Sequence, residues 1–248
     1  MQWLDVVPAV PVIGCRFTPD FEAAFDYLRR IAPLLNEDAK TGKTAAIAQP
    51  SPGVLNIEWT DGFECRLTPT EIILLFQYRV APKREVAKLP MAECGKLESY
   101  STLLHSMISR YNRIAKAVLS GHRLLHRVGV VANAWMAVES LPPGVKEYFE
   151  HQGALWRRSA VRVQSSIVIP LHQDERSIER CNYMLFYDAD IEPKGEINLQ
   201  LDWQYLFNEP NKVDSNQLAN QIDPLVKKAL AWFERFGAGE YRDETAGS

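Results

Sequence analysis

Two carboxylates one residue apart close an apolar, aromatic run in the second half of the chain. The run "NYMLFYDADIE" covers residues 182–192 and contains Asp188 and Asp190. On a strand both side chains point to one face, roughly 7 Å apart, and Mg²⁺ or Mn²⁺ uses such pairs when another acid or a substrate phosphate completes the octahedron. Nearby glutamates, Glu179 among them, stand at no recognisable ligand spacing. Because a D-x-D pair alone is a weak signal, we interpret it as a strand end, and Asp188 and Asp190 are metal ligands only in an alternative hypothesis.

Basic residues are the second group with possible chemistry. A phosphate-binding face would need them to fold together, whereas the net charge of −3 and the pI near 6.0 give no global attraction to nucleic acid. We therefore favour a solvated helix face with ordinary ion pairs, and keep Arg127, Arg157, Arg158 and Arg162 as candidates for phosphate or nucleic-acid contact. The full basic set is Arg110, Arg113, Lys116, Arg123, Arg127, Arg157, Arg158 and Arg162.

Other motifs give no catalytic residue. "TGKT" at 41–44 lacks the first glycine of a phosphate-binding loop, since Glu37 stands there, and it follows a helix instead of a strand. His122 and His126 would lie about 13 Å apart on a strand and could not share a zinc ion. The chain has no G-x-S-x-G nucleophile signature. We predict no catalytic residue and no cofactor.

The cysteines and the N-terminal residues suggest a compartment. The four cysteines lie far apart without a C-x-x-C pair, which is typical of reduced thiols in a cytosolic protein. The first residues carry Asp5 where a signal peptide would be basic. No segment reaches the roughly 20 apolar residues that span a bilayer. We expect a soluble cytoplasmic protein.

Hydrophobic periodicity predicts an order of elements that occurs twice. A strand at 11–17 precedes an amphipathic helix at 18–36, with Thr18 as N-cap and Pro19 in its first position. Strands and a long apolar-striped helix follow, and the second half again reads strands, then a final helix. The predicted ranges are 45–50, 53–59, 64–67 and 71–80 for strands, 97–120 for the helix, then a strand from 128, a short helix at 144–152, strands at 159–171, 181–191 and 196–203, and a helix at 214–236.

The resulting fold class is α+β. We expect two pseudo-repeated β-α-β-β-β-α halves whose mostly antiparallel sheets carry long helices on one face. The halves are residues 1–120 and 121–248, forming one compact unit with a frayed tail at 237–248.

Several of these segments resemble sporadically distributed bacterial proteins of similar length that form a family of unknown function. The matching features are an Arg-x-Gly strand, here Arg127-Val128-Gly129, an aspartate-bearing strand with Asp188 and Asp190, and a final helix closing with Phe233 or Phe236. The resemblance implies a cytosolic accessory protein of mobile-element, defence or toxin–antitoxin loci, without assigned catalytic residues.

Three functional hypotheses follow. The leading one is a non-enzymatic binding or regulatory protein, an immunity component for example, that recognises a protein partner. The second is a metal-dependent enzyme acting on a phosphodiester or nucleotide through Asp188 and Asp190. The third is nucleic-acid binding through a local basic patch, with steeply salt-dependent affinity. Neither the partner nor the oligomeric state follows from the sequence.

Overall fold

One antiparallel sheet organises the protein. The computed structural model describes residues 7–8, 11–76, 100–137, 162–188 and 196–237. Ten strands form the sheet in the order β3-β4-β5-β6-β2-β7-β10-β9-β8, with β1 paired to β7 beside this path. The strands are β1 (Val7–Pro8), β2 (Val12–Phe17), β3 (Ala45–Ser51), β4 (Val54–Trp59), β5 (Phe63–Leu67), β6 (Glu71–Phe76), β7 (Arg123–Ala137), β8 (Arg162–Gln173), β9 (Ser177–Asp188) and β10 (Glu196–Val213).

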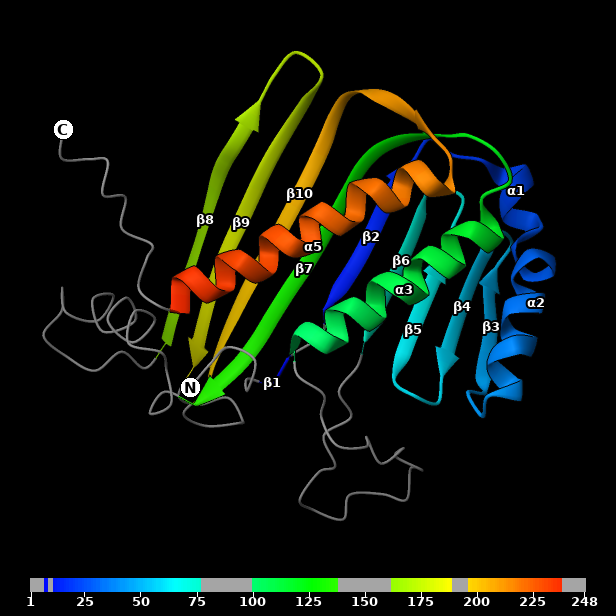
Figure 1. The fold of residues 1–248 in the computed structure, drawn as a ribbon, viewed down its shortest axis with the longest axis horizontal. Coiled ribbons are helices and arrows are strands. Elements are labelled where there is room, and N and C mark those ends of the chain that lie inside the picture. The colour runs from blue at the N-terminus through cyan, green and yellow to red at the C-terminus, as the bar shows by residue number, and fades with distance from the viewer. Residues whose placement is uncertain (1–6, 9–10, 77–99, 138–161, 189–195, 238–248) are drawn as a thin grey trace, which may run out of the picture.

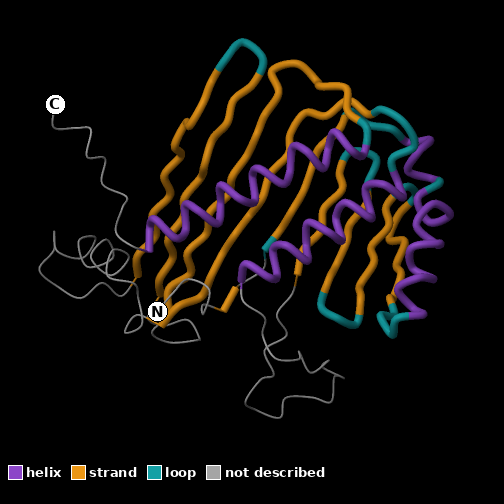
Figure 2. The backbone as a smooth tube through the Cα atoms, in the orientation of Figure 1, coloured by secondary structure: helices purple, strands orange, loops and turns teal. Residues whose placement is uncertain are grey.

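Helices lie on one face of this sheet (Figure 1). The two longest, α3 (Tyr100–Val118) and α5 (Ser215–Gly237), cross the strands side by side, and α1 (Phe21–Phe25) and α2 (Tyr27–Lys40) lie near the β3 edge. Figure 2 shows the same layers, with the helices in front of the strands. None of the described helices is long and apolar enough to cross a membrane.

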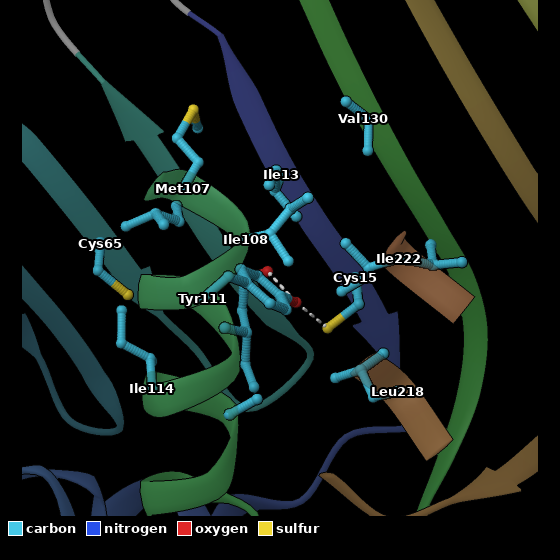
Figure 3. Close-up of a cluster of buried hydrophobic side chains, with 14 of the residues drawn as sticks. Ile13, Cys15, Cys65, Met107, Ile108, Tyr111, Ile114, Val130, Leu218 and Ile222 are labelled. Carbon is cyan, nitrogen blue, oxygen red and sulfur yellow. Dashed lines mark hydrogen bonds between the residues drawn. The ribbon is translucent and has the colours of Figure 1, made fainter. Parts of the chain in front are cut away.

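Alternating burial explains how the strands carry the helices. In β2 the side chains of Ile13, Cys15 and Phe17 are buried while their neighbours are half-buried or exposed, which is the period-two pattern of a strand with one covered face. In Figure 3, Tyr111 of α3 points toward Cys15, and its hydroxyl donates to the Cys15 sulfur at 2.8 Å. Leu218 of α5 borders the same cluster. The core is therefore one continuous layer between sheet and helices.

The predicted class, α+β with a mostly antiparallel sheet, is confirmed. The boundary predicted at 120/121 falls between α3 and β7, and the strands on either side of it, β2 and β7, pair directly. The helix predicted at 144–152 and the tail after residue 237 lie outside the described residues.

The predicted first helix is wrong in its start and its continuity. Asp20, not Thr18, is the N-cap, and its carboxylate accepts a hydrogen bond from the Ala23 amide. The helix then breaks at Asp26 into α1 and α2. Thr18 is instead held by the sheet, because its amide donates to the Leu124 carbonyl at 2.8 Å. Long-range pairing thus overrides a local capping signal.

Candidate binding site on the uncovered face of the sheet

The opposite face of the sheet is covered by no described helix, and we call it the uncovered face (Figure 1). Its side chains are those at strand positions that alternate with the buried ones. Its central members are Val12, Gly14, Arg16, Arg66, Glu71, Ile73, Arg127, Gly129, Val131, Arg180, Asp202 and Gln204.

Two glycines produce a hollow at the centre of this face. Gly14 of β2 lies directly opposite Gly129 of β7, so two neighbouring positions carry no side chain. A Cβ at Gly129 would approach the Trp203 carbonyl oxygen to 3.2 Å, whereas a Cβ at Gly14 would meet Ile73 at an ordinary 3.5 Å. The pocket has a volume of about 220 Å³. Its lining is Val12, Gly14, Cys15, Glu71, Ile73, Arg127, Gly129, Val131, Asp202 and Gln204.

Arg127 is the charged donor of this pocket. It is half-buried, two positions before Gly129 on β7, and directly opposite Arg16 of β2. Within the part of the chain that the structure describes, its guanidinium has no hydrogen-bond or ion-pair partner. An arginine carries five N–H donors, so Arg127 is free to bind an acceptor that enters the pocket.

A relay of polar side chains borders the pocket on the side of β9 and β10. The Arg180 guanidinium donates to the Gln204 side-chain oxygen at 2.8 and 3.2 Å, and the Gln204 amide donates to the Asp202 carboxylate. Burial raises the pKa of Asp202, while the Gln204 hydrogen bond and the charges of Arg127 and Arg180 oppose that rise. Asp202 is therefore a carboxylate held in a partly desolvated position.

Replacing Asp202 with asparagine is expected to stabilise the protein at neutral pH. A carboxyl with a raised folded-state pKa makes folding less favourable as the pH rises from its ordinary value of 3.8 through the folded value. The neutral amide of asparagine removes this pH-dependent loss of stability, and its oxygen still accepts the hydrogen bond from the Gln204 side chain. Urea unfolding of wild type and Asp202→Asn should show a stability gain that grows from acid to neutral pH.

Asp174 supplies the control of opposite sign. The Arg176 and Ser177 backbone amides lower the pKa of its carboxyl. Asp174→Asn should therefore destabilise at neutral pH, and that difference should narrow as the pH falls. If Asp202→Asn raised the free energy of unfolding equally at every pH, the result would contradict a buried charge at Asp202.

Three of the basic residues predicted on and near the long helix, Arg110, Arg113 and Arg123, are paired. Arg110 of α3 makes a bidentate contact with Asp61 at 2.7 and 3.0 Å, and Arg113 lies 3.0 Å from Asp38. Arg123 is buried and donates to the carbonyls of Thr18 and Pro69. These contacts agree with the predicted ion pairs. They differ from the predicted solvated face, because Arg110 and Arg123 are buried.

Of the four arginines predicted to contact phosphate, Arg127 alone has a described side chain. Arg157 and Arg158 lie outside the described residues, and Arg162 is described only in its backbone, at the start of β8. The arrangement of these four arginines stays a prediction.

The metal hypothesis also stays a prediction. Asp188 is the last residue of β9 and its backbone lies opposite Arg162, while Asp190 is outside the described residues. Glu179 faces the helices and is bound by Lys228 and Trp203 at 2.6 to 2.8 Å, so it is not available as a third ligand. Among the described residues, no group of three His, Cys, Asp or Glu side chains could hold an ion.

The predicted histidines and cysteines have simple environments. His122 is exposed just before β7, and the His126 ring nitrogen lies 2.9 Å from the Thr18 hydroxyl. Cys15, Cys65 and Cys181 are buried free thiols, and burial raises the pKa of Cys15 to about 12. Burial likewise raises the pKa of Cys65 and Cys181, so the nucleophilic thiolate form is disfavoured at all three positions at neutral pH.

Sequence reasoning missed Gly14, Gly129, Asp202 and Gln204 as site residues. The two glycines stand inside strand patterns, where an isolated glycine indicates close backbone approach or a bulge. That signal was present at both positions. Their pairing across the sheet, and the acid beside them, follow only from the strand order.

Comparison of the chain with family models, curated proteins and solved structures gave no match in any of the three.

Proposed function

We propose that this chain is a non-enzymatic cytosolic binding protein that presents the uncovered face of its sheet to a protein partner. The observation that carries the proposal is the Gly14–Gly129 hollow with unpaired charges at its border. The accessory or immunity role implied by the family resemblance is part of the same proposal.

The charges of the two faces differ in a way that supports partner binding. On the helix side, Arg110, Arg113 and Lys228 are each paired with a carboxylate. On the uncovered face, Arg127 and Glu71 have no ion-pair partner among the described residues. Unpaired charges beside apolar side chains are what a complementary partner satisfies, and they determine specificity and association rate.

The size of the pocket also supports a protein partner. Its volume of about 220 Å³ lies below the roughly 300–1,000 Å³ of typical small-molecule sites. A space of this size accommodates one large side chain, and a pocket that accepts a single anchoring side chain is typical of the centre of a protein interface.

The proposal includes two related halves that meet at the hollow. Two correspondences support this relation. Gly14 lies in one cross-strand register with Ile73 of β6 and Arg66 of β5. Gly129 lies in the same way in register with Gln204 of β10 and Arg180 of β9. Two residues before Ile73 and Gln204 stand the acids Glu71 and Asp202. Each half thus contributes a glycine, an acid and an arginine at matching places.

Replacing Gly14 with valine is expected to abolish partner binding without weakening the fold. The new side chain would enter the pocket, and its Cβ would have only an ordinary contact with Ile73. A glycine inside a strand costs about 0.5–1 kcal/mol relative to alanine, and valine favours strands. The free energy of unfolding should therefore stay equal or rise.

The test is gentle purification of the tagged chain from its host, followed by native mass spectrometry. Wild type should carry a protein partner in stoichiometric amount. In Gly14→Val the amount of bound partner should fall by about tenfold or more. Lys227→Ala, on the exposed surface of α5, should bind as much partner as wild type. Retention by Gly14→Val, or a bound nucleotide or metal in place of a protein, would overturn the proposal.

A further inference from the structure

We propose that Arg127 anchors a single carboxylate side chain of the protein partner in the Gly14–Gly129 pocket. This inference rests on the proposed function and specifies the chemistry of the partner at that same site. It concerns a glutamate or aspartate side chain presented by a folded or extended segment of the partner.

The position of Arg127 carries the first step. Its side chain is half-buried and lines the pocket, yet no hydrogen bond or ion pair within the described residues uses its donors. A partly desolvated guanidinium without an acceptor is unfavourable. A carboxylate would accept two parallel N–H bonds from the planar group, which is the geometry that arginine matches best.

The neighbouring acid does not satisfy Arg127. Asp202 accepts from Gln204, which in turn is held by Arg180. Arg127 influences Asp202 only through its charge, as one of the causes that oppose the rise in the pKa of that carboxyl. Arg180 and Asp202 are thus both engaged with Gln204, and the donors of Arg127 stay available for an incoming anion.

The acids at the border select the kind of anion. Glu71 lines the pocket at the β6 side, where it lies opposite Arg16, and Asp202 lines it at the β10 side, so an acid stands at each border of the pocket. A nucleic-acid strand brings a charge with every phosphate, and repulsion from these acids would oppose it. One isolated carboxylate reaches Arg127 while the rest of its chain stays neutral or basic near Glu71 and Asp202.

Apolar side chains complete the fit. Val12, Ile73 and Val131 line the same pocket and would contact the methylene groups of the incoming side chain. The absence of side chains at Gly14 and Gly129 leaves room for the approach. Arginine is enriched among residues that dominate interface energetics when such pockets close over them.

The experiment uses nuclear magnetic resonance on the full chain with three small probes. N-acetyl-glutamate methylamide carries one carboxylate, its glutamine counterpart is the neutral isostere, and dimethyl phosphate represents a phosphodiester. The Arg127 Nε–H and the backbone amides of Gly14 and Gly129 are the reporters. The glutamate probe should shift them saturably in the millimolar range, and the other two probes should bind at least about fivefold more weakly.

Variants distinguish the guanidinium from its charge. Arg127→Lys keeps the charge but lacks the planar guanidinium, so its affinity for the glutamate probe should be at least about threefold lower than that of wild type. Arg127→Gln removes the charge as well and should abolish the shifts at Gly14 and Gly129. Arg29→Gln is the control, because Arg29 is an exposed arginine of α2, away from the uncovered face, and its loss should leave the shifts at Gly14 and Gly129 unchanged.

Two results would overturn the anchor. One is binding of dimethyl phosphate as tight as that of the glutamate probe, and the other is no saturable shift with the glutamate probe up to about 50 mM. If the glutamate probe fails while Gly14→Val still loses its protein partner, the proposed function stands and the acidic anchor is wrong. If Gly14→Val keeps its partner, the proposed function itself is wrong.

Discussion

Replacing Arg123 with alanine is expected to lower the free energy of unfolding by about 3–5 kcal/mol. Arg123 begins β7 with 9% of its surface exposed. Its guanidinium donates to the carbonyls of Thr18 and Pro69 at 3.1 and 2.9 Å and lies 4.9 Å from the centre of the Phe17 ring. The truncated side chain would leave two carbonyls without this donor, a cavity at the ring, and Asp20 without its neighbouring charge.

Arg123→Lys separates packing from hydrogen bonding. The ammonium keeps the charge but cannot reach several acceptors from one planar group, so we expect it to recover less than half of the loss. Arg16→Ala is the matched control, since that arginine is exposed and should change stability by no more than about 0.5 kcal/mol. Equilibrium urea unfolding provides the comparison. A loss below about 1 kcal/mol for Arg123→Ala would contradict the buried role of this side chain.

Arg123 also joins segments that are distant in the sequence. Its partners are Thr18 directly after β2, Pro69 in the turn before β6 and Tyr27 at the start of α2. These segments belong to residues 1–120, whereas Arg123 belongs to β7. We therefore expect a single unfolding transition in wild type, because all of β2 pairs with β7 and Arg123 adds these contacts between the two halves.

The elements with local signals were predictable from the sequence. The apolar stripes of α3 and α5 repeat at helical spacing, and the structure places these helices at Tyr100–Val118 and Ser215–Gly237, within a few residues of the predicted ends. The turn between β4 and β5 has a local signal as well, because Asp61-Gly62 is a dipeptide that hairpins favour, and Gly62 has a positive φ of 92°. Each of these signals depends on residues that are close in the chain.

Elements that depend on distant partners were predicted poorly. β10 was expected to end at Trp203, but it continues to Val213 through an irregularity between Leu206 and Asn211, because β7 offers backbone partners on both sides of it. Likewise the predicted strands at 159–171 and 181–191 are separated by a much shorter turn than their bounds imply, because β8 continues to Gln173 and β9 begins at Ser177, which pairs with Phe207 of β10. Strand length is decided by the neighbouring strand and not by the polar residues alone.

The candidate site shows the same limit. Arg127 was identifiable from its charge, but its pocket depends on Gly14, which lies more than a hundred residues away in the chain. Arg110 was grouped with Arg113 as one helix surface, although Arg110 is buried against the hairpin turn. A sequence pattern indicates which side chains share an element face. It does not indicate which other element covers that face.

Replacing Asp61 with alanine is expected to destabilise the protein by about 2–4 kcal/mol, because Arg110 would become a buried charge without its carboxylate. The Arg110 side chain is only 7% exposed and makes both of its hydrogen bonds to Asp61 at 2.7 and 3.0 Å. Its guanidinium also lies 4.9 Å and 4.2 Å from the ring centres of Trp59 and Phe63. The partial exposure of Asp61, 28%, places the expected loss below that of a fully buried pair.

Lys43 provides the matched control for Asp61→Ala, and a second substitution at Arg110 tests the cause. Lys43 lies 3.6 Å from the same carboxylate but is half exposed, so Lys43→Ala should cost no more than about 0.5 kcal/mol. The double variant Asp61→Ala/Arg110→Met should regain much of the stability that Asp61→Ala loses, since methionine removes the unpaired charge and still packs on the two rings. Urea unfolding of wild type, Asp61→Ala, Arg110→Met and the double variant closes the cycle. Equal losses in the single and double variants would show that Asp61 acts through the turn backbone and not through Arg110.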